Sequence, residues 1–246
     1  HGTIYRVPIS GTIDLGLAPF VNRTINEAHA NQASAILLDI DTFGGRVDAA
    51  VKIRDALLDA PVRTIAFVHP RAISAGALIT LACETVVMTP GGSIGAATPV
   101  TTEGGKMEAA DEKVVSYMRA EMRATAERRN RRADIAEAMV DADIEIEEVT
   151  EAGKLLTLTT DEALELEIAD LTAIDVDDLL VQLDLDQATI IDGTINWAEQ
   201  IARMVSHPVL SSFLLSIGFL GIMIELYQPG WGIPGTVGIS CLLVFF

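Results

Sequence analysis

The sequence predicts an α/β fold with a largely parallel sheet, followed by helices that cross a membrane. Strand-like and helix-like segments alternate along residues 3–89, in the rhythm of βαβ units. Residues 35–40 are apolar almost throughout, which is typical of a strand buried on both faces of a parallel sheet. Residues 209–246 carry a single charged side chain, Glu225. Long uncharged segments that contain Gly and Pro are typical of membrane helices.

The expected elements follow from hydrophobic periodicity and turn residues. Helical spacing places Val114, Val115, Met118 and Met122 on the inward face of one long helix. Turns or loops are expected at 10–12, 42–45, 90–97 and 100–110, the last polar and mobile. The expected strands are 3–9, 35–40, 63–68 and 85–89. The expected helices are 16–31, 47–58, 75–83, 111–129, 133–140, a helix that begins at Thr160 after the segment 155–159, and 178–183.

Charge and cysteine content exclude several classes of function. The net charge is −18, from 35 acidic and 17 basic residues. Nucleic acid binding requires a basic surface, so we expect no nucleic acid partner. The two cysteines, Cys83 and Cys241, provide neither a disulfide framework nor the spacing of a metal site. The glycine-rich loop at 90–97 lacks the spacing of a nucleotide-binding loop. We therefore expect no metal and no cofactor.

Three regions are expected along the chain. Residues 1–192 form an α/β domain, 193–208 an amphipathic juxtamembrane linker helix, and 209–246 a membrane region. The run from Val209 to Leu226 would extend about 27 Å as a helix, enough to span the hydrocarbon core of a bilayer. The chain ends inside an apolar run, so we interpret it as part of a longer protein. The alternative for the apolar tail is a buried hairpin of a soluble core.

Ser74 is the candidate nucleophile. It lies between the strand-like run 63–68 and the apolar helical run 75–83, among small residues. A serine at this position can be exposed and activated. It can also be an ordinary N-cap that satisfies the free amides of the first helical turn.

A serine nucleophile requires a base. His69 is five residues before Ser74, and we expect the strand end to point it away from the hydroxyl. A lysine can act as base at neutral pH when apolar surroundings lower its pKa. Lys113 opens the long helix and is the lysine best placed to reach a pocket. The alternative is a solvated lysine paired with Asp111 or Glu112. The remaining histidines and lysines are His1, His29, His207, Lys52, Lys106 and Lys154.

Backbone amides near Ser74 could stabilise an oxyanion. Gly44 and Gly45 follow a buried strand and allow close approach of a ligand. The amide of Ala75, at a helix N-terminus, would be a second donor. The alternative for the two glycines is a plain βα turn.

Four motifs in order resemble the NfeD family of membrane-bound serine proteases, in the Clp protease/crotonase superfamily. The resemblance covers nearly the whole chain. Its segments are Asp41–Asp48, Ala72–Ala77, Met88–Ala96 and Lys113, with Leu220-Gly221, Glu225-Leu226 and Pro229–Gly235 in the membrane part.

The resemblance implies a Clp protease/crotonase-like fold and a Ser-Lys dyad, with Ser74 as nucleophile and Lys113 as general base. It implies Gly45 and Ala75 as oxyanion donors, with Gly44, Phe43 and Ile73 in contact with substrate. Phe43 stands where many relatives have proline.

The resemblance also implies substrates and a location. The expected substrate is an apolar peptide segment, in some relatives the tail of a stomatin-like membrane protein. We expect membrane lipid as a partner, a homodimer or larger assembly, and a protease domain outside the cytoplasm. The alternative is a non-catalytic membrane scaffold that organises a stomatin-like partner. Acyl-CoA chemistry is a third possibility, disfavoured because no basic cluster is present for CoA phosphates.

Overall fold

The computed structural model describes residues 2–103, 106–206, 208–227 and 232–245. It divides into two compact units. The first comprises the chain up to Ile13 together with Leu17–Thr194, and the second comprises Asp14–Gly16 with Ile195–Phe246.

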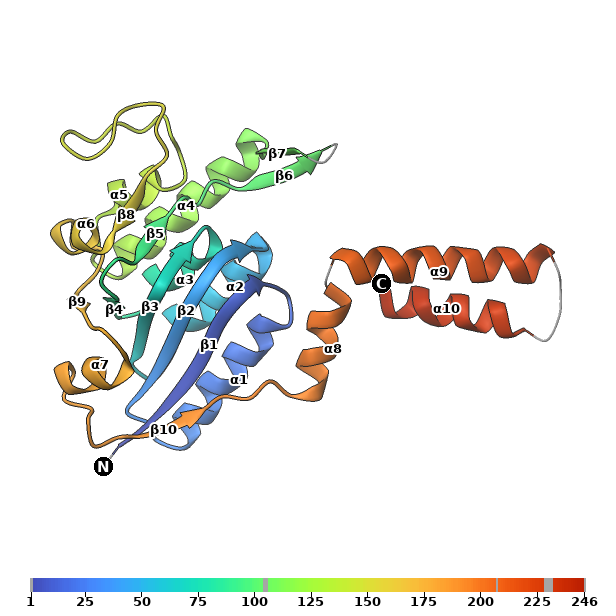
Figure 1. Cartoon of the computed structure of the whole chain (residues 1–246), viewed down its shortest axis with the longest axis horizontal. Coiled ribbons are helices and arrows are strands. Elements are labelled where there is room, and N and C mark those ends of the chain that lie inside the picture. Colours follow the sequence, from blue (N-terminus) through green and yellow to red (C-terminus); the bar gives the residue numbers. More distant parts are fainter. Residues whose placement is uncertain (1, 104–105, 207, 228–231, 246) are drawn as a thin grey trace. The chain divides into compact units, whose positions relative to one another are not determined.

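The first unit is built on a mainly parallel sheet with strand order β10-β1-β2-β3-β4-β9 (Figure 1). β5 extends the sheet beside β3, and β8 pairs with β5 in antiparallel orientation. The candidate site around Ser74 lies at one end of the sheet, where the long central strands end. The strands are β1 (Thr3–Ile13), β2 (Ala35–Gly45), β3 (Thr64–Ile73), β4 (Thr85–Met88), β5 (Ser93–Gly95), β8 (Thr157–Thr159), β9 (Leu171–Thr172) and β10 (Thr189–Asp192).

Helices connect the parallel strands, as the sequence predicts. Helical spacing predicts one inward stripe on the first helix, and every residue of it is buried: Leu17, Phe20, Val21, Thr24, Ile25 and Ala28. A capping box joins Thr159 and Glu162 at the helix that begins with Thr160. The helices are α1 (Leu17–Ala30), α2 (Val47–Leu58), α3 (Ala75–Leu81), α4 (Glu112–Arg128), α5 (Ala133–Ala138), α6 (Thr160–Glu165) and α7 (Val176–Gln182).

Strand β2 is buried on both faces. On one face, Leu37 belongs to a hydrophobic core with Ile65, Phe67 and Leu179 of α7. Its neighbours Ile36 and Leu38 point to the other face, where α1, α2 and α3 lie, and both are fully buried. Burial of each large aliphatic side chain stabilises the fold by about 1.5–3 kcal/mol. The expected double-sided burial of residues 35–40 is thus confirmed, with only Asp39 half-buried.

Two expected turns are parts of strands. Residues 10–12 do not reverse the chain, because β1 continues to Ile13 through a register shift between Ser10 and Thr12. Residues 42–45 are the end of β2 and not a separate loop. Thr42 pairs with β3, and Gly45 pairs with Ile13 of β1, so inter-strand pairing continues as far as Gly45.

The polar segment 100–110 contains an antiparallel pair and is not a plain loop. β6 (Val100–Glu103) pairs with β7 (Lys106–Ala109), while residues 104 and 105 lie outside the described residues. On the following helix, Val115, Met118 and Met122 are buried as predicted. Val114 is 38% exposed, so its inward placement was wrong. It lies 100° around the helix from Val115 and points off the buried stripe.

The second unit contains α8 (Trp197–Ser206), α9 (Pro208–Tyr227) and α10 (Ile233–Phe245) (Figure 1). Leu210–Tyr227 is long and apolar enough to cross a membrane. Only 6% of this stretch is buried, unlike the core helix of a soluble domain. Glycines let α9 and α10 pack closely, since a Cβ on Gly221 would lie 2.5 Å from the Pro234 carbonyl oxygen. The sequence predicts an interfacial turn with aromatic anchors at residues 227–231, of which 228–231 lie outside the described ranges.

Candidate active site

Ser74 lies in a sharp turn between β3 and α3, with φ 56° and ψ −123°. A positive φ is uncommon for a non-glycine residue and costs about 1–3 kcal/mol. The Ser74 amide donates a hydrogen bond to the Gly95 carbonyl oxygen of β5 at 2.9 Å, which fixes the turn. Ser74 occupies the N-cap position of α3, but its side chain makes no capping hydrogen bond and so does not satisfy the free amides of the first turn. A strained strand-to-helix turn, with a half-buried serine hydroxyl that has no hydrogen bond to the described residues, is a geometry in which a serine can act as a nucleophile.

Gly44 lies directly against Ser74. A Cβ on Gly44 would be 2.6 Å from the Ser74 Cβ and 3.0 Å from its Oγ. Gly44 also has φ +109°, which favours glycine. The close contact with Ser74 and the positive φ explain why a glycine occupies this position near the end of β2.

Thr42 organises this end of the sheet, a role that the sequence reasoning missed. Its Oγ1 accepts a hydrogen bond from the Gly44 amide at 2.9 Å and donates one to the Gly11 carbonyl oxygen at 2.5 Å. A Cβ on Gly76 would lie 2.6 Å from the Thr42 Cγ2. Thr42 therefore joins the irregular part of β1, the end of β2 and the start of α3. The available signal was a β-branched residue between the polar Asp41 and the exposed Phe43, at an inward position of the strand alternation.

The Gly45 amide faces away from β1. The next residue, Arg46, donates its amide to the Ile13 carbonyl oxygen at 2.8 Å. Successive amides of a strand point to opposite edges, so the Gly45 amide points toward the β3 side, where Ser74 lies. A Cβ on Gly45 would lie 2.2 Å from the Ile13 carbonyl oxygen, which excludes a larger residue.

A cavity of about 340 Å³ joins three of the predicted site residues, Ser74, Gly45 and Ala75. Most of the remaining lining is apolar, and much of it comes from segments distant in the sequence. Sequence reasoning missed these residues because only the tertiary fold brings them together. They are Thr12, Arg46, Val47, Ala97, Pro99, Val100 and Met118.

Lys113 does not lie in this cavity. It is exposed in the first turn of α4 and is not among the described residues that line the cavity with Ser74. The expected alternative partner Glu112 is paired with Arg119 at 2.9 Å. Lys113 lies one helical turn before Tyr117, on the same face of α4. The same helix contributes Met118 to the cavity, so the start of α4 borders the site without placing the amine in it.

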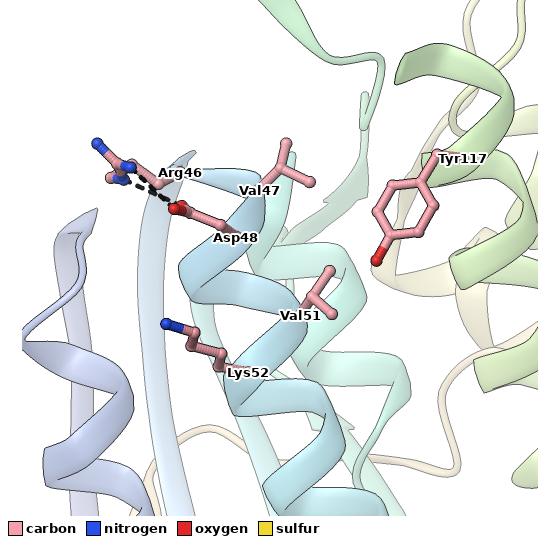
Figure 2. Close-up of a pocket in the computed structure, with 6 residues that line it drawn as sticks. All are labelled: Arg46, Val47, Asp48, Val51, Lys52 and Tyr117. Carbon is pink, nitrogen blue, oxygen red and sulfur yellow. Dashed lines mark hydrogen bonds and ion pairs between the residues drawn. The ribbon is translucent and has the colours of Figure 1, made fainter. Parts of the chain in front are cut away.

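A second hollow, of about 560 Å³, adjoins the cavity between α2 and α4 (Figure 2). Figure 2 shows Tyr117 reaching from α4 toward Val47 and Val51 on α2. Arg46 and Val47 line both the hollow and the Ser74 cavity. Hydrogen bonds from Arg46, at 2.8 and 3.0 Å, hold the pKa of Asp48 below its ordinary value. The hollow thus has an apolar floor and a charged rim.

Phe43 and Ile73 lie outside the described lining of the cavity. Phe43 is 73% exposed, and the Arg71 guanidinium lies over its ring, 4.6 Å from the ring centroid. Arg71 is also paired with Asp41 at 2.9 Å. Ile73 is half-buried beside Gly95 in the β3–β5 pair. Phe43 is therefore an exposed apolar ring near the end of β2, held in place by Arg71.

His69 is exposed, and its ring lies 5.4 Å from that of Phe67. It was expected at a strand end, but β3 continues past it to Ile73. It does not belong to the described lining of the cavity, in line with the expectation that it points away from Ser74.

The fold and site define a membrane protein with a Clp protease-like domain. A model of the NfeD1b N-terminal domain matches residues 3–193, and a model of the NfeD integral membrane domain matches residues 209–246. The chain belongs to the NfeD family. The predicted family and fold class are thereby confirmed.

Two relatives match almost all of the chain. Membrane protein NfeD1b of Bacillus subtilis is 40% identical over 245 residues, covering 99% of this chain and 55% of the relative. Membrane-bound protease PH1510 of Pyrococcus horikoshii is 28% identical over 262 residues, covering 98% and 57%. The chain thus spans about half the length of these relatives.

Solved structures of the 1510-N membrane-bound stomatin-specific protease share the fold. A serine-to-alanine mutant superposes with a TM-score of 0.69 at 26% identity, covering 79% of this chain and 99% of that one. A lysine-to-alanine mutant in complex with a substrate peptide gives 0.71 at 25% identity, covering 83% and 98%.

Proposed function

We propose that this chain carries the protease domain of a membrane-anchored serine endopeptidase, with Ser74 as nucleophile and Lys113 as general base. The observation that carries the proposal is the strained, uncapped Ser74 beside Gly45 and Ala75 in one cavity. The likeness to a membrane-bound stomatin-specific protease supports it.

The oxyanion donors in this proposal are the amides of Gly45 and Ala75. Gly45 turns its amide toward the Ser74 side of β2, and Ala75 is the first residue of α3. Two amides aimed at a developing negative charge stabilise a tetrahedral intermediate, and loss of one such donor typically costs 10²–10³-fold in rate, as an order of magnitude. The Gly44 amide is excluded because Thr42 accepts its hydrogen bond.

The base has to enter the cavity from α4. Arg46 is the one basic side chain in the described lining, and a guanidinium does not deprotonate in proteins. Lys113 would approach Ser74 when the start of α4 closes over substrate. Catalytic contacts are often long before substrate binds. A lysine-to-alanine mutant of the related protease was solved with a substrate peptide, which supports a lysine in the mechanism.

The reaction proceeds through an acyl-enzyme in this scheme. Ser74 Oγ attacks the peptide carbonyl carbon while its proton passes to the Lys113 amine. The tetrahedral intermediate collapses, and Lys113 returns the proton to the leaving amine. Water, deprotonated by the same amine, then hydrolyses the ester and restores Ser74.

The substrate is an apolar peptide segment. The Ser74 cavity presents Val47, Ala97 and Met118 to a substrate side chain. The adjoining hollow, floored by Val51 and Tyr117, would take a neighbouring apolar side chain. Phe43 offers a further apolar contact, and Gly44 and Ile73 would lie along the bound peptide. A stomatin-like membrane protein is the proposed source of the segment, because the related protease is stomatin-specific.

Assembly and orientation complete the proposal. The chain acts as a homodimer or larger assembly, with the protease domain outside the cytoplasm. The proposed regions are a protease domain at 1–192, a linker helix at 193–208 and a membrane region at 209–246.

A non-catalytic scaffold is the second candidate function. The position of Lys113 outside the Ser74 cavity favours it. In that case the same domain would bind an apolar segment without cleaving it.

Cleavage of a fluorogenic apolar peptide by the full chain in nanodiscs tests the proposal. Ser74→Ala and Lys113→Ala are each expected to lower the rate on the order of 10⁴-fold. Lys154→Ala is the matched control, because Lys154 is an exposed lysine paired with Glu151. Loss in Ser74→Ala alone would refute the assignment of Lys113. Unchanged cleavage in both variants would refute the dyad, and binding of the peptide without cleavage by the wild type would favour the scaffold.

A further inference from the structure

In helix α8 the two charged side chains are buried or half-buried, whereas the three largest apolar side chains are exposed. Glu199 is 6% exposed, and the Arg203 side chain is 27% exposed. By contrast Trp197, Ile201 and Met204 are 77%, 51% and 56% exposed. This is the reverse of an ordinary surface helix in water.

Specific contacts hold the charged side in place. Arg203 Nε is 2.8 Å from Asp14 Oδ2, and the Asp14 side chain is itself only 15% exposed. Glu199 and Asn196 cap the helix reciprocally, with the Asn196 amide 2.8 Å from the Glu199 carboxylate. Gly16 allows the close approach, since a Cβ there would lie 2.5 Å from Arg203 Cγ. The charged side is therefore the packed side, and the apolar side faces outward.

The three exposed apolar residues lie on one side of the helix, beside the exposed Gln200. Trp197, Ile201 and Met204 are spaced by four and three positions, so they lie along one stripe of the helix. Helix α8 ends at Ser206 and α9 begins at Pro208, within the same compact unit. The stripe thus leads directly to the stretch that is long enough to cross a membrane.

We propose that the Trp197–Ile201–Met204 face of α8 lies in the headgroup region of the same bilayer that α9 crosses. Tryptophan is enriched at this depth because its ring is apolar and its N–H is polar. Amphipathic helices that lie along a membrane bury their apolar face at the boundary between headgroups and acyl chains. Three side chains are too few for a stable protein interface, which needs roughly 800 Å² from each partner. A lipid surface needs no such area, since α9 already anchors the chain.

Tryptophan quenching in the full chain, reconstituted into phosphatidylcholine vesicles, tests this. The sequence has two tryptophans, so Trp231→Phe leaves Trp197 as the reporter. Lipids brominated close to the headgroup should quench Trp197 at least about twofold more than lipids brominated near the chain ends, as expected for a helix at the interface. The control moves the reporter to another exposed apolar position, by Trp197→Phe, Trp231→Phe and Ile174→Trp. Ile174 is 68% exposed in the first unit, and its replacement should show no quenching.

Three outcomes would overturn the proposal. Water-like emission of Trp197, unquenched by either lipid, would place the face in solvent. Blue-shifted emission that no brominated lipid quenches would mean that protein covers the face. Equal quenching of Trp197 and of the Ile174→Trp reporter would remove the specificity of α8. Ile201→Asp provides a second reading, because a charge on the stripe should weaken the quenching while peptide cleavage or binding by the first unit is unchanged.

Discussion

Gly44 and Ser74 lie so close that no side chain fits between them. A Cβ on Gly44 would be 2.6 Å from the Ser74 Cβ, and Gly44 has φ +109°. The end of β2 therefore fixes the turn that carries Ser74.

Gly44→Ala is expected to abolish peptide cleavage and to lower the free energy of unfolding by about 1–3 kcal/mol, through backbone strain and displacement of Ser74. Gly91→Ala is the matched control. Gly91 also has a positive φ, +74°, but a Cβ there meets nothing within 4 Å. It should lose stability and keep activity. Equal activity in the two variants would show that the Gly44–Ser74 contact is dispensable.

Phe43→Ala should raise the KM for an apolar peptide several-fold with little change in kcat. Arg71 stacks on the ring at 4.6 Å and is itself held by Asp41, so the ring is a supported contact surface. Phe43→Leu should recover most of the loss because it keeps the apolar area. Ile174→Ala, at another exposed apolar residue, should leave KM unchanged. An unaltered KM in Phe43→Ala would remove this residue from the substrate site.

Arg131→Met is expected to destabilise the first unit by about 1–3 kcal/mol, because it removes the hydrogen-bond donor of the buried Ile168 carbonyl oxygen. The Arg131 side chain is 4% exposed and donates to Asp170 and to the carbonyl oxygens of Ile168 and Glu84. Arg128→Ala, at an arginine whose side chain is 57% exposed, should cost less than about 1 kcal/mol. Chemical denaturation measures both. A small change in Arg131→Met would mean that the pair with Asp170 is not needed for folding.

Burial raises the pKa of the Cys83 thiol to about 12, from an ordinary value of 9.0. Because the thiolate is the reactive form, Cys83 should resist iodoacetamide at pH 8 in the folded protein and react after unfolding. The stability from the protonated thiol is present below pH 9 and is lost as pH rises toward 12. Labelling in a Cys241→Ser background, followed by mass spectrometry, isolates Cys83. Rapid modification of the folded protein would contradict its burial.

The sequence predicted those features that depend on local pattern. The buried stripe of α1 and the double-sided burial of β2 follow from periodicity alone. The role of Gly44 did not follow, because a Gly-Gly pair after a strand looks the same whether it turns or continues into further pairing. Its place in β2 depends on the irregular register of β1 at Ser10–Thr12, a tertiary contact.

The position of the Lys113 side chain could not be predicted for a similar reason. Spacing places Lys113 at the start of a long helix, which the structure confirms. The direction of that first turn depends on the β6–β7 pair before it and on Met118 packing into the cavity. Both features are tertiary contacts, so the hydrophobic periodicity around Lys113 does not reveal them.

Reaction of the folded chain with a fluorophosphonate, followed by peptide mass spectrometry, tests the central assignment most directly. The expected result is a single adduct on Ser74, absent in Ser74→Ala and strongly slowed in Lys113→Ala. Ser116→Ala, at an exposed serine of α4, should label as the wild type does. An absence of adduct at Ser74 in folded protein held in lipid, or equal labelling of wild type and Lys113→Ala, would contradict the proposed Ser74–Lys113 dyad.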